Sequence, residues 1–107
     1  MTGNEYQKLA ARTINEMLPR THKENHALFG MASEVGEIHG IYQKWYQGHS
    51  IVDDDLKKEL GDLLWFIAEF CTVNCWDLEE IMYMNIDKLK KRYPEGFSEE
   101  KSINRTE

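Results

Sequence analysis

The sequence predicts an all-α protein, a small bundle of about four helices. Apolar residues recur at steps of three and four along most of the chain, which is the period of a helix, and no segment alternates as a strand would. Proline or glycine ends three of these segments, at Pro19, Gly48 and Pro94. By length the 107 residues make one domain, which we expect over residues 1–97, followed by a polar tail over residues 98–107.

Composition narrows the possible functions. The net charge is −6, which disfavours a nucleic acid polymer as partner, because phosphate binding needs a basic surface. No apolar run reaches the roughly 18–20 residues that cross a bilayer. The first ten residues, MTGNEYQKLA, lack the basic and then apolar pattern of a signal peptide. We therefore expect a cytoplasmic protein that does not bind membranes.

The first helix is predicted from about Asn4 to Leu18, where Pro19 ends it. Its apolar stripe consists of Tyr6, Leu9, Ala10, Ile14 and Met17.

The second helix is predicted to begin with a capping box in THKE, with Thr21 as the N-cap and Glu24 reaching back to it. We expect this helix to run to about Gln47 and to stop at Gly48. The stripe predicted to face the core is Leu28, Met31, Val35, Ile38, Tyr42 and Trp45.

The third helix is predicted over about residues 53–75, with Ser50 or an aspartate as its cap. The acidic run over residues 53–55 suits the positive end of a helix dipole. After Leu60 the segment is apolar nearly all round, so it should be the central helix. Cys71 and Cys75 lie four residues apart, and we expect both to be buried, reduced thiols that pack as small apolar groups.

The fourth helix follows the acidic pair Asp77 and Glu80 and runs to about Tyr93, ended by Pro94 and Gly96. Four helices from so short a chain leave faces open for a second copy, so we expect an oligomer.

Two acidic pairs are the most informative feature of the chain. Glu34 and Glu37 lie three residues apart, as do Glu59 and Asp62, so each pair shares one helix face. If the second and third helices are antiparallel neighbours, as a short connection favours, the four carboxylates converge. Two like charges about 4 Å apart repel by about 4 kcal/mol at an effective dielectric constant of 20.

This repulsion predicts a cation. Neither acidic tetrapeptide contains lysine or arginine, and carboxylate oxygens are the ligands that Mg²⁺ prefers, with Mn²⁺ as a possible substitute. Zinc fits less well, because the glutamate between His22 and His26 is misplaced for a zinc-protease motif. A di-iron or di-manganese carboxylate oxidase is disfavoured, since neither pair ends in histidine.

Each pair also encloses a glycine, Gly36 or Gly61, inside a predicted helix. Glycine there costs about 1 kcal/mol relative to alanine. We interpret both as positions of close approach; the plainer alternative is two packing glycines beside surface acids.

Basic residues supply a second half of the site. Asn85, Lys88 and Arg92 form one stripe at i, i+3 and i+7, and Lys44 lies two turns beyond Glu37. These side chains are candidates to contact a phosphate chain. The alternative is a solvated basic helix end that complements the dipole.

With these residues placed, the chain resembles the MazG-like nucleotide pyrophosphohydrolases of the all-α NTP pyrophosphatase group. The resemblance rests on E-x-x-E at Glu34–Glu37, a spacer of 21 residues, and E-x-x-D at Glu59–Asp62. The downstream segment NIDKLKKRYPEGFS and the opening NEYQKLAARTI are also similar to the family, so the similarity covers most of the chain. One departure is Ser33, where many relatives carry a further acid.

The resemblance implies hydrolysis of nucleoside triphosphates, with ribose or deoxyribose, to a monophosphate and pyrophosphate. It implies Mg²⁺, and a homodimer or homotetramer with sites near subunit interfaces. Glu34, Glu37, Glu59 and Asp62 become metal ligands, and Glu34 or Glu37 also helps to activate the attacking water. Asn85, Lys88, Arg92 and, less directly, Lys44 become substrate contacts. The competing hypothesis is a non-enzymatic, acidic helical interaction module.

Overall fold

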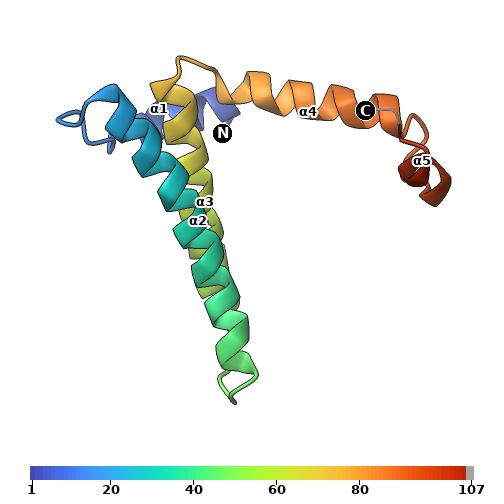
Figure 1. Ribbon diagram of the computed structural model, residues 1–107, viewed down its shortest axis with the longest axis horizontal. Helices are drawn as coiled ribbons and strands as arrows, with labels where there is room; N and C mark the ends of the chain where they lie inside the picture. Colours follow the sequence, from blue (N-terminus) through green and yellow to red (C-terminus); the bar gives the residue numbers. More distant parts are fainter. Residues whose placement is uncertain (106–107) are drawn as a thin grey trace.

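The computed structural model describes residues 1–105, and its architecture is all-α, as predicted (Figure 1). Within these residues there are helices and no strand. No helix in this part of the chain is long and apolar enough to cross a membrane. The helices are α1 (Gly3–Ala11), α2 (Arg20–Trp45), α3 (Asp53–Val73), α4 (Leu78–Arg92) and the short α5 (Glu99–Ile103).

Helices α2 and α3 form a long antiparallel hairpin, the largest feature of the molecule (Figure 1). Gly48 ends α2 as predicted, with a φ of +96° that glycine adopts without steric cost. The Gly48 N–H donates to the Trp45 carbonyl at 3.0 Å and the His49 N–H donates to the Lys44 carbonyl at 3.1 Å. This pair of bonds is a Schellman motif, and it turns the chain back toward α3.

Helix α1 lies against α3 and is shorter than predicted, ending at Ala11 rather than at Leu18. The Trp65 indole Nε1 donates to the Ala10 carbonyl at 3.2 Å and to Thr13 Oγ1 at 2.9 Å, and the Thr13 hydroxyl also donates to the Ala10 carbonyl. These hydrogen bonds occur where further backbone hydrogen bonds would have continued α1. Ile14 then turns into the core, while Leu9 is 49% exposed and Met17 is 91% exposed, so the predicted stripe is buried at Ala10 and Ile14 and fails at Leu9 and Met17.

The caps predicted for α2 and α3 are wrong. Helix α2 begins at Arg20 after Pro19, and Thr21 lies inside the helix. The φ of Pro19, −60°, suits a helix start, and the Pro19 carbonyl accepts from the Lys23 N–H at 3.0 Å. Val52 precedes α3 and makes no side-chain cap, although the acidic run does occupy the first turn of α3 as expected.

Gln7 joins α1 to the α3–α4 connection. Its Nε2 donates to Thr72 Oγ1 at 3.2 Å and to the Trp76 carbonyl at 2.8 Å, and its Oε1 accepts from the Leu78 N–H at 2.7 Å. Asp77, the N-cap of α4, makes no such side-chain bond. Gln7 therefore satisfies the first turn of α4 from another helix. From this joint α4 extends away from the hairpin (Figure 1).

The end of α3 is a second Schellman motif. The Trp76 N–H donates to the Cys71 carbonyl at 2.9 Å and the Cys75 N–H to the Thr72 carbonyl at 3.1 Å. Trp76 packs on Phe70 with ring centroids 5.9 Å apart, the apolar contact typical of this motif. Cys75 holds the left-handed position with φ +59° and is exposed, so only Cys71 is the buried thiol that we expected.

The core of the single chain is thin. Its buried apolar residues are Ala10, Ile14, Ala27, Ala68, Cys71 and Leu78. The stripe predicted to face the core on α2 is wrong for most of its members: Leu28, Val35, Tyr42 and Trp45 are exposed. Every residue from 80 to 91 on α4 is exposed as well. One protomer therefore does not close into the predicted bundle.

Beyond α4, residues 98–105 of the predicted polar tail include the five-residue helix α5. Ser98 Oγ caps α5 by accepting from the Lys101 N–H at 3.0 Å. Residues 106 and 107 of that tail lie outside the described part of the chain.

Candidate metal centre

The candidate site lies on the seam where α2 faces α3. The antiparallel packing of two straight helices puts residues of falling number on α3 opposite residues of rising number on α2. Three facing layers follow one another: His26 with Glu69, Gly30 with Phe66, and Glu34 with Glu59 and Asp62.

The carboxylates come together at the third layer. One oxygen each from Glu34, Glu59 and Asp62 lies within 4.8 Å of the other two. Glu37, one helix turn beyond Glu34, is within hydrogen-bonding reach of Glu59. The structure thus gathers three of the four predicted acids into one group, and Glu37 lies beside Glu59 at its edge.

Electrostatics within the cluster favour protonated carboxyl groups. The pKa of Glu37 is raised above its usual value, first because the Glu59 carboxyl lies within hydrogen-bonding reach and second by Coulomb repulsion from that carboxyl. The pKa of Glu59 is also raised, chiefly because the Glu34 carboxyl lies within hydrogen-bonding reach. Carboxyl groups forced together hold protons in this way when no cation balances them.

The oxygen set fits a hard divalent cation. Glu34 Oε2 and Glu59 Oε2 are buried, and neither has a hydrogen-bond donor among the described residues. Buried acceptors without a donor are rare and call for an explanation such as an ion. Carboxylate oxygens from two helices suit Mg²⁺ or Mn²⁺ better than the softer metals that take sulfur or imidazole.

Tyr6 extends the site to a third helix. Burial, and secondarily the charge of Asp62, raise the pKa of the Tyr6 hydroxyl, so this side chain of α1 lies within electrostatic reach of the cluster. The sequence marks Tyr6 only as part of an apolar stripe. Its position depends on where α1 docks on α3, which no local pattern reveals.

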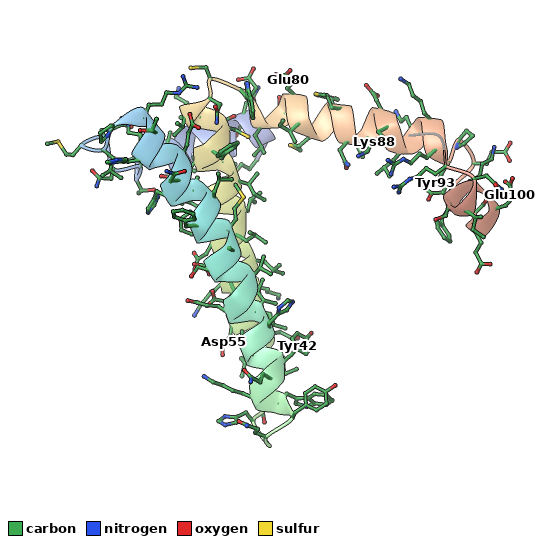
Figure 2. The ribbon with its side chains drawn as sticks, in the orientation of Figure 1. Tyr42, Asp55, Glu80, Lys88, Tyr93 and Glu100 are labelled. Atoms are coloured by element: carbon green, nitrogen blue, oxygen red, sulfur yellow. The ribbon has the colours of Figure 1, made fainter. Side chains whose placement is uncertain are left out.

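The basic residues are not brought to the carboxylates within one protomer. Asn85, Lys88 and Arg92 lie on α4, which extends away from the hairpin, and the labelled Lys88 is far from the seam in Figure 2. Arg92 Nε is buried and has no acceptor among residues 1–105. Lys44 is exposed near the end of α2 and makes no ion pair with any described residue.

The prediction that the helices approach closely at Gly36 and Gly61 is wrong. A Cβ added to Gly36 or Gly61 would meet no atom of the described chain within 4 Å. A Cβ on Gly30 would instead overlap the ring of Phe66. Close approach of α2 and α3 therefore occurs one turn before the carboxylate cluster, at a glycine that lies outside both acidic motifs.

Sequence reasoning also missed a buried glutamate that is hydrogen-bonded to a histidine. Glu69 is 2% exposed, and both of its oxygens lie near His26 Nδ1, at 2.8 and 3.0 Å. A carboxylate in a predicted core segment is a signal that it has a partner, because burying a charge alone is costly. His26 is thus hydrogen-bonded to Glu69 through Nδ1.

Comparison with known proteins decides the family. The model of the MazG nucleotide pyrophosphohydrolase domain matches residues 20–97, nearly three quarters of the chain. The chain belongs to the MazG family. The matched region includes the whole α2–α3 hairpin with its carboxylate cluster, and α4 with its basic stripe.

One curated relative of this MazG-family chain is the Gene 37 protein of Mycobacterium phage L5. It is 29% identical over 87 residues, which cover 76% of this chain and 75% of the phage protein. Its name states no activity. No solved structure matches the chain significantly.

Proposed function

We propose that this protein is a cytoplasmic, Mg²⁺-dependent nucleoside triphosphate pyrophosphohydrolase, with Mn²⁺ as a substitute metal. The observation that supports this most is the pair of buried oxygens without donors, Glu34 Oε2 and Glu59 Oε2, beside Asp62. Family membership gives the reaction class. Two free cysteines, one of them exposed, are consistent with a reducing compartment.

In the proposed reaction, water attacks the α-phosphorus of a nucleoside triphosphate. The new bond joins the water oxygen to the phosphorus, the bond to the bridging α–β oxygen breaks with its electron pair, and pyrophosphate leaves the monophosphate. Glu34, Glu59 and Asp62 hold Mg²⁺, with Glu37 at the edge of the set. When bound, Mg²⁺ supplies positive charge that stabilises the phosphate oxygens in the transition state.

We assign Glu37 as the general base, which accepts the proton from the attacking water. It is exposed, while Glu34 and Glu59 are partly buried, so it can reach a water at the edge of the site. Tyr6 lies close enough to Asp62 to border the bound substrate.

We further propose that a second protomer completes the site. Helix α4 carries exposed apolar residues, Met82, Ile86 and Leu89, next to its stripe of Asn85, Lys88 and Arg92. Covering that apolar face with another chain would place the basic stripe against the partner. The partner's cluster is acidic, so the charges are complementary, and α4 could then supply the phosphate contacts that its own protomer lacks.

The alternative of a non-enzymatic interaction module accounts for the exposed apolar faces equally well. It does not account for carboxylates gathered on a helix seam with buried oxygens and no donor, since acids that serve solubility point into water.

The test is Mg²⁺-dependent release of pyrophosphate from a panel of ribo- and deoxyribonucleoside triphosphates. Glu37→Gln should lower kcat at least about a hundredfold, the usual contribution of a positioned base, with helicity by circular dichroism unchanged. Glu5→Gln, which removes an exposed carboxyl on α1, is the matched control and should keep the wild-type rate. A Glu37→Gln enzyme with near-normal turnover would end this assignment.

A further inference from the structure

Gly30 and Phe66 form the layer that lies between the contact of His26 with Glu69 and the carboxylate cluster. Gly30 lies four residues before Glu34 on α2, and Phe66 lies four residues after Asp62 on α3. One turn of helix, about 5.4 Å, therefore separates this contact from the acids on both sides of the seam. Since any Cβ at position 30 would overlap the Phe66 ring, the two helices are as close here as the ring allows.

Phe66 is held in place from both sides. Its ring packs at 5.5 Å from the His26 ring and edge-on at 5.1 Å from the Trp65 ring. His26 is in turn held by the buried Glu69 carboxylate, and the Trp65 indole donates to Thr13. Because these contacts oppose rotation of the Phe66 ring, we expect a methyl group at Gly30 to push the two backbones apart.

We infer that the Gly30–Phe66 contact is a spacer that sets the separation of the two acidic pairs and thereby tunes metal affinity. Glu34 is on one helix, whereas Glu59 and Asp62 are on the other, so the distance between the helices is the distance between ligands. Mg²⁺ demands near-ideal octahedral geometry, and positions displaced by more than about 0.5 Å lose function. Gly30 and Phe66 are positioning residues, and this role rests on the proposed metal site.

The experiment measures Mn²⁺ binding directly, by loss of the free-ion electron paramagnetic resonance signal, with no substrate present. Gly30→Ala should weaken Mn²⁺ binding about ten- to a hundredfold, as substitutions that disturb ligand orientation do. Gly40→Ala is the matched control, because it adds the same methyl to α2 where nothing lies within 4 Å, and it should bind Mn²⁺ like the wild type.

A second substitution separates the spacer from general damage. Phe66→Leu removes Cε1 and Cζ, two of the three ring atoms that the new methyl would meet, so Gly30→Ala/Phe66→Leu should recover part of the lost affinity. Wild-type affinity in a folded Gly30→Ala protein, or no recovery in the double variant, would overturn the inference. If Gly30→Ala does not fold, Phe66→Leu alone decides, because unchanged affinity there would equally overturn it. A wild-type chain that does not bind Mn²⁺ would instead contradict the metal site itself.

Discussion

Glu59 is the residue at which repulsion between the carboxyl groups of the site is concentrated. Its carboxyl lies within hydrogen-bonding reach of both Glu34 and Glu37, and the charge of Asp62 adds to the repulsion. The folded-state pKa values of Glu59 and Glu37 are raised, so the folded protein holds protons that the unfolded chain would release. The stability from these groups is therefore present at acidic pH and is lost as pH rises from 4.5, the ordinary glutamate pKa, through the raised values.

The loss of stability with rising pH gives a prediction for Glu59→Gln. In EDTA at pH 7.5 the variant should melt at a higher temperature than the wild type, because an amide relieves the repulsion and can donate to Glu34. The gain should shrink as pH falls toward 4.5, where the wild-type carboxyls take up protons. Thermal denaturation across this range measures it.

Mg²⁺ provides the control for that experiment. Saturating Mg²⁺ should raise the wild-type melting temperature and reverse the order of the two proteins, because a ligand of the native state stabilises it. A melting-temperature difference that is the same at every pH, with and without the metal, would contradict the repulsion that we place at Glu59.

The hydrogen bond between His26 and the buried Glu69 is the other main contribution to stability at this scale. His26→Ala leaves a carboxyl group that is 2% exposed without its partner, and we expect it to lower the free energy of unfolding by about 2 kcal/mol. His26→Leu/Glu69→Leu, which removes both polar side chains, should recover most of that loss. Urea denaturation measures both, and a double variant less stable than His26→Ala would show that the pair is not a matched unit.

At the scale of elements, the two Schellman motifs differ in one residue. Gly48 ends α2 with a φ of +96°, whereas Cys75 ends α3 with a φ of +59°, in a region that costs a side chain about 1–2 kcal/mol. The hydrogen bonds of the two ends are otherwise alike. The end of α3 therefore holds strain that glycine would remove.

Cys75→Gly should accordingly raise the free energy of unfolding by about 1 kcal/mol, and Gly48→Ala should lower it by about the same amount. The pair of substitutions tests one conformation in both directions, and urea denaturation measures both. If both variants shifted stability in the same direction, the left-handed backbone would not be the cause.

Local patterns predicted those features that depend on one helix. The stop at Gly48, the end of α4 before Pro94 and the acidic first turn of α3 all follow from residue chemistry in the immediate neighbourhood. The approach of Glu34 to Glu59 and Asp62 could be predicted as well, because i, i+3 spacing on two helices with a short connection leaves few other arrangements.

Features that depend on a neighbouring helix were not predictable in this way. At the early end of α1, the Ala10 carbonyl accepts from Trp65, 55 residues away, as well as from the Thr13 N–H. The cap of α4 comes from Gln7, and close approach falls at Gly30 because Phe66 lies opposite. The core stripe of α2 failed because a helical period identifies an apolar face but not the molecule that covers it.

At the scale of the whole molecule, one protomer is too open for its size. Its radius of gyration is 17.2 Å, against about 13 Å for a globular chain of this length. Its accessible surface is 8262 Å², whereas a folded monomer of 12.6 kDa exposes about 6,200 Å². The excess of about 2,000 Å² is what a protomer of a permanent homodimer buries. We expect a homodimer, or a homotetramer built from two of them.

A mixing experiment tests whether the site is shared between protomers. Asp62→Asn removes an acid and Lys88→Ala a base, so each protein alone should be inactive. Refolded together in equal amounts, half of the dimers are mixed, and each mixed dimer regains one intact site if α4 acts on its partner. The mixture should then reach about a quarter of the wild-type rate. No regained activity would place Lys88 in the site of its own chain.

The uncovered face of α4 has a consequence for the life of the chain after synthesis. In the homodimer that we expect, this face is covered, so a newly made single chain exposes Met82, Ile86 and Leu89 to water, where the helix is open to proteolysis and aggregation. Encounter between two chains is a second-order event, so the vulnerable interval shortens as copies accumulate. The lifetime of the protein should therefore increase with its concentration, and low concentration should be the condition under which it is most readily degraded.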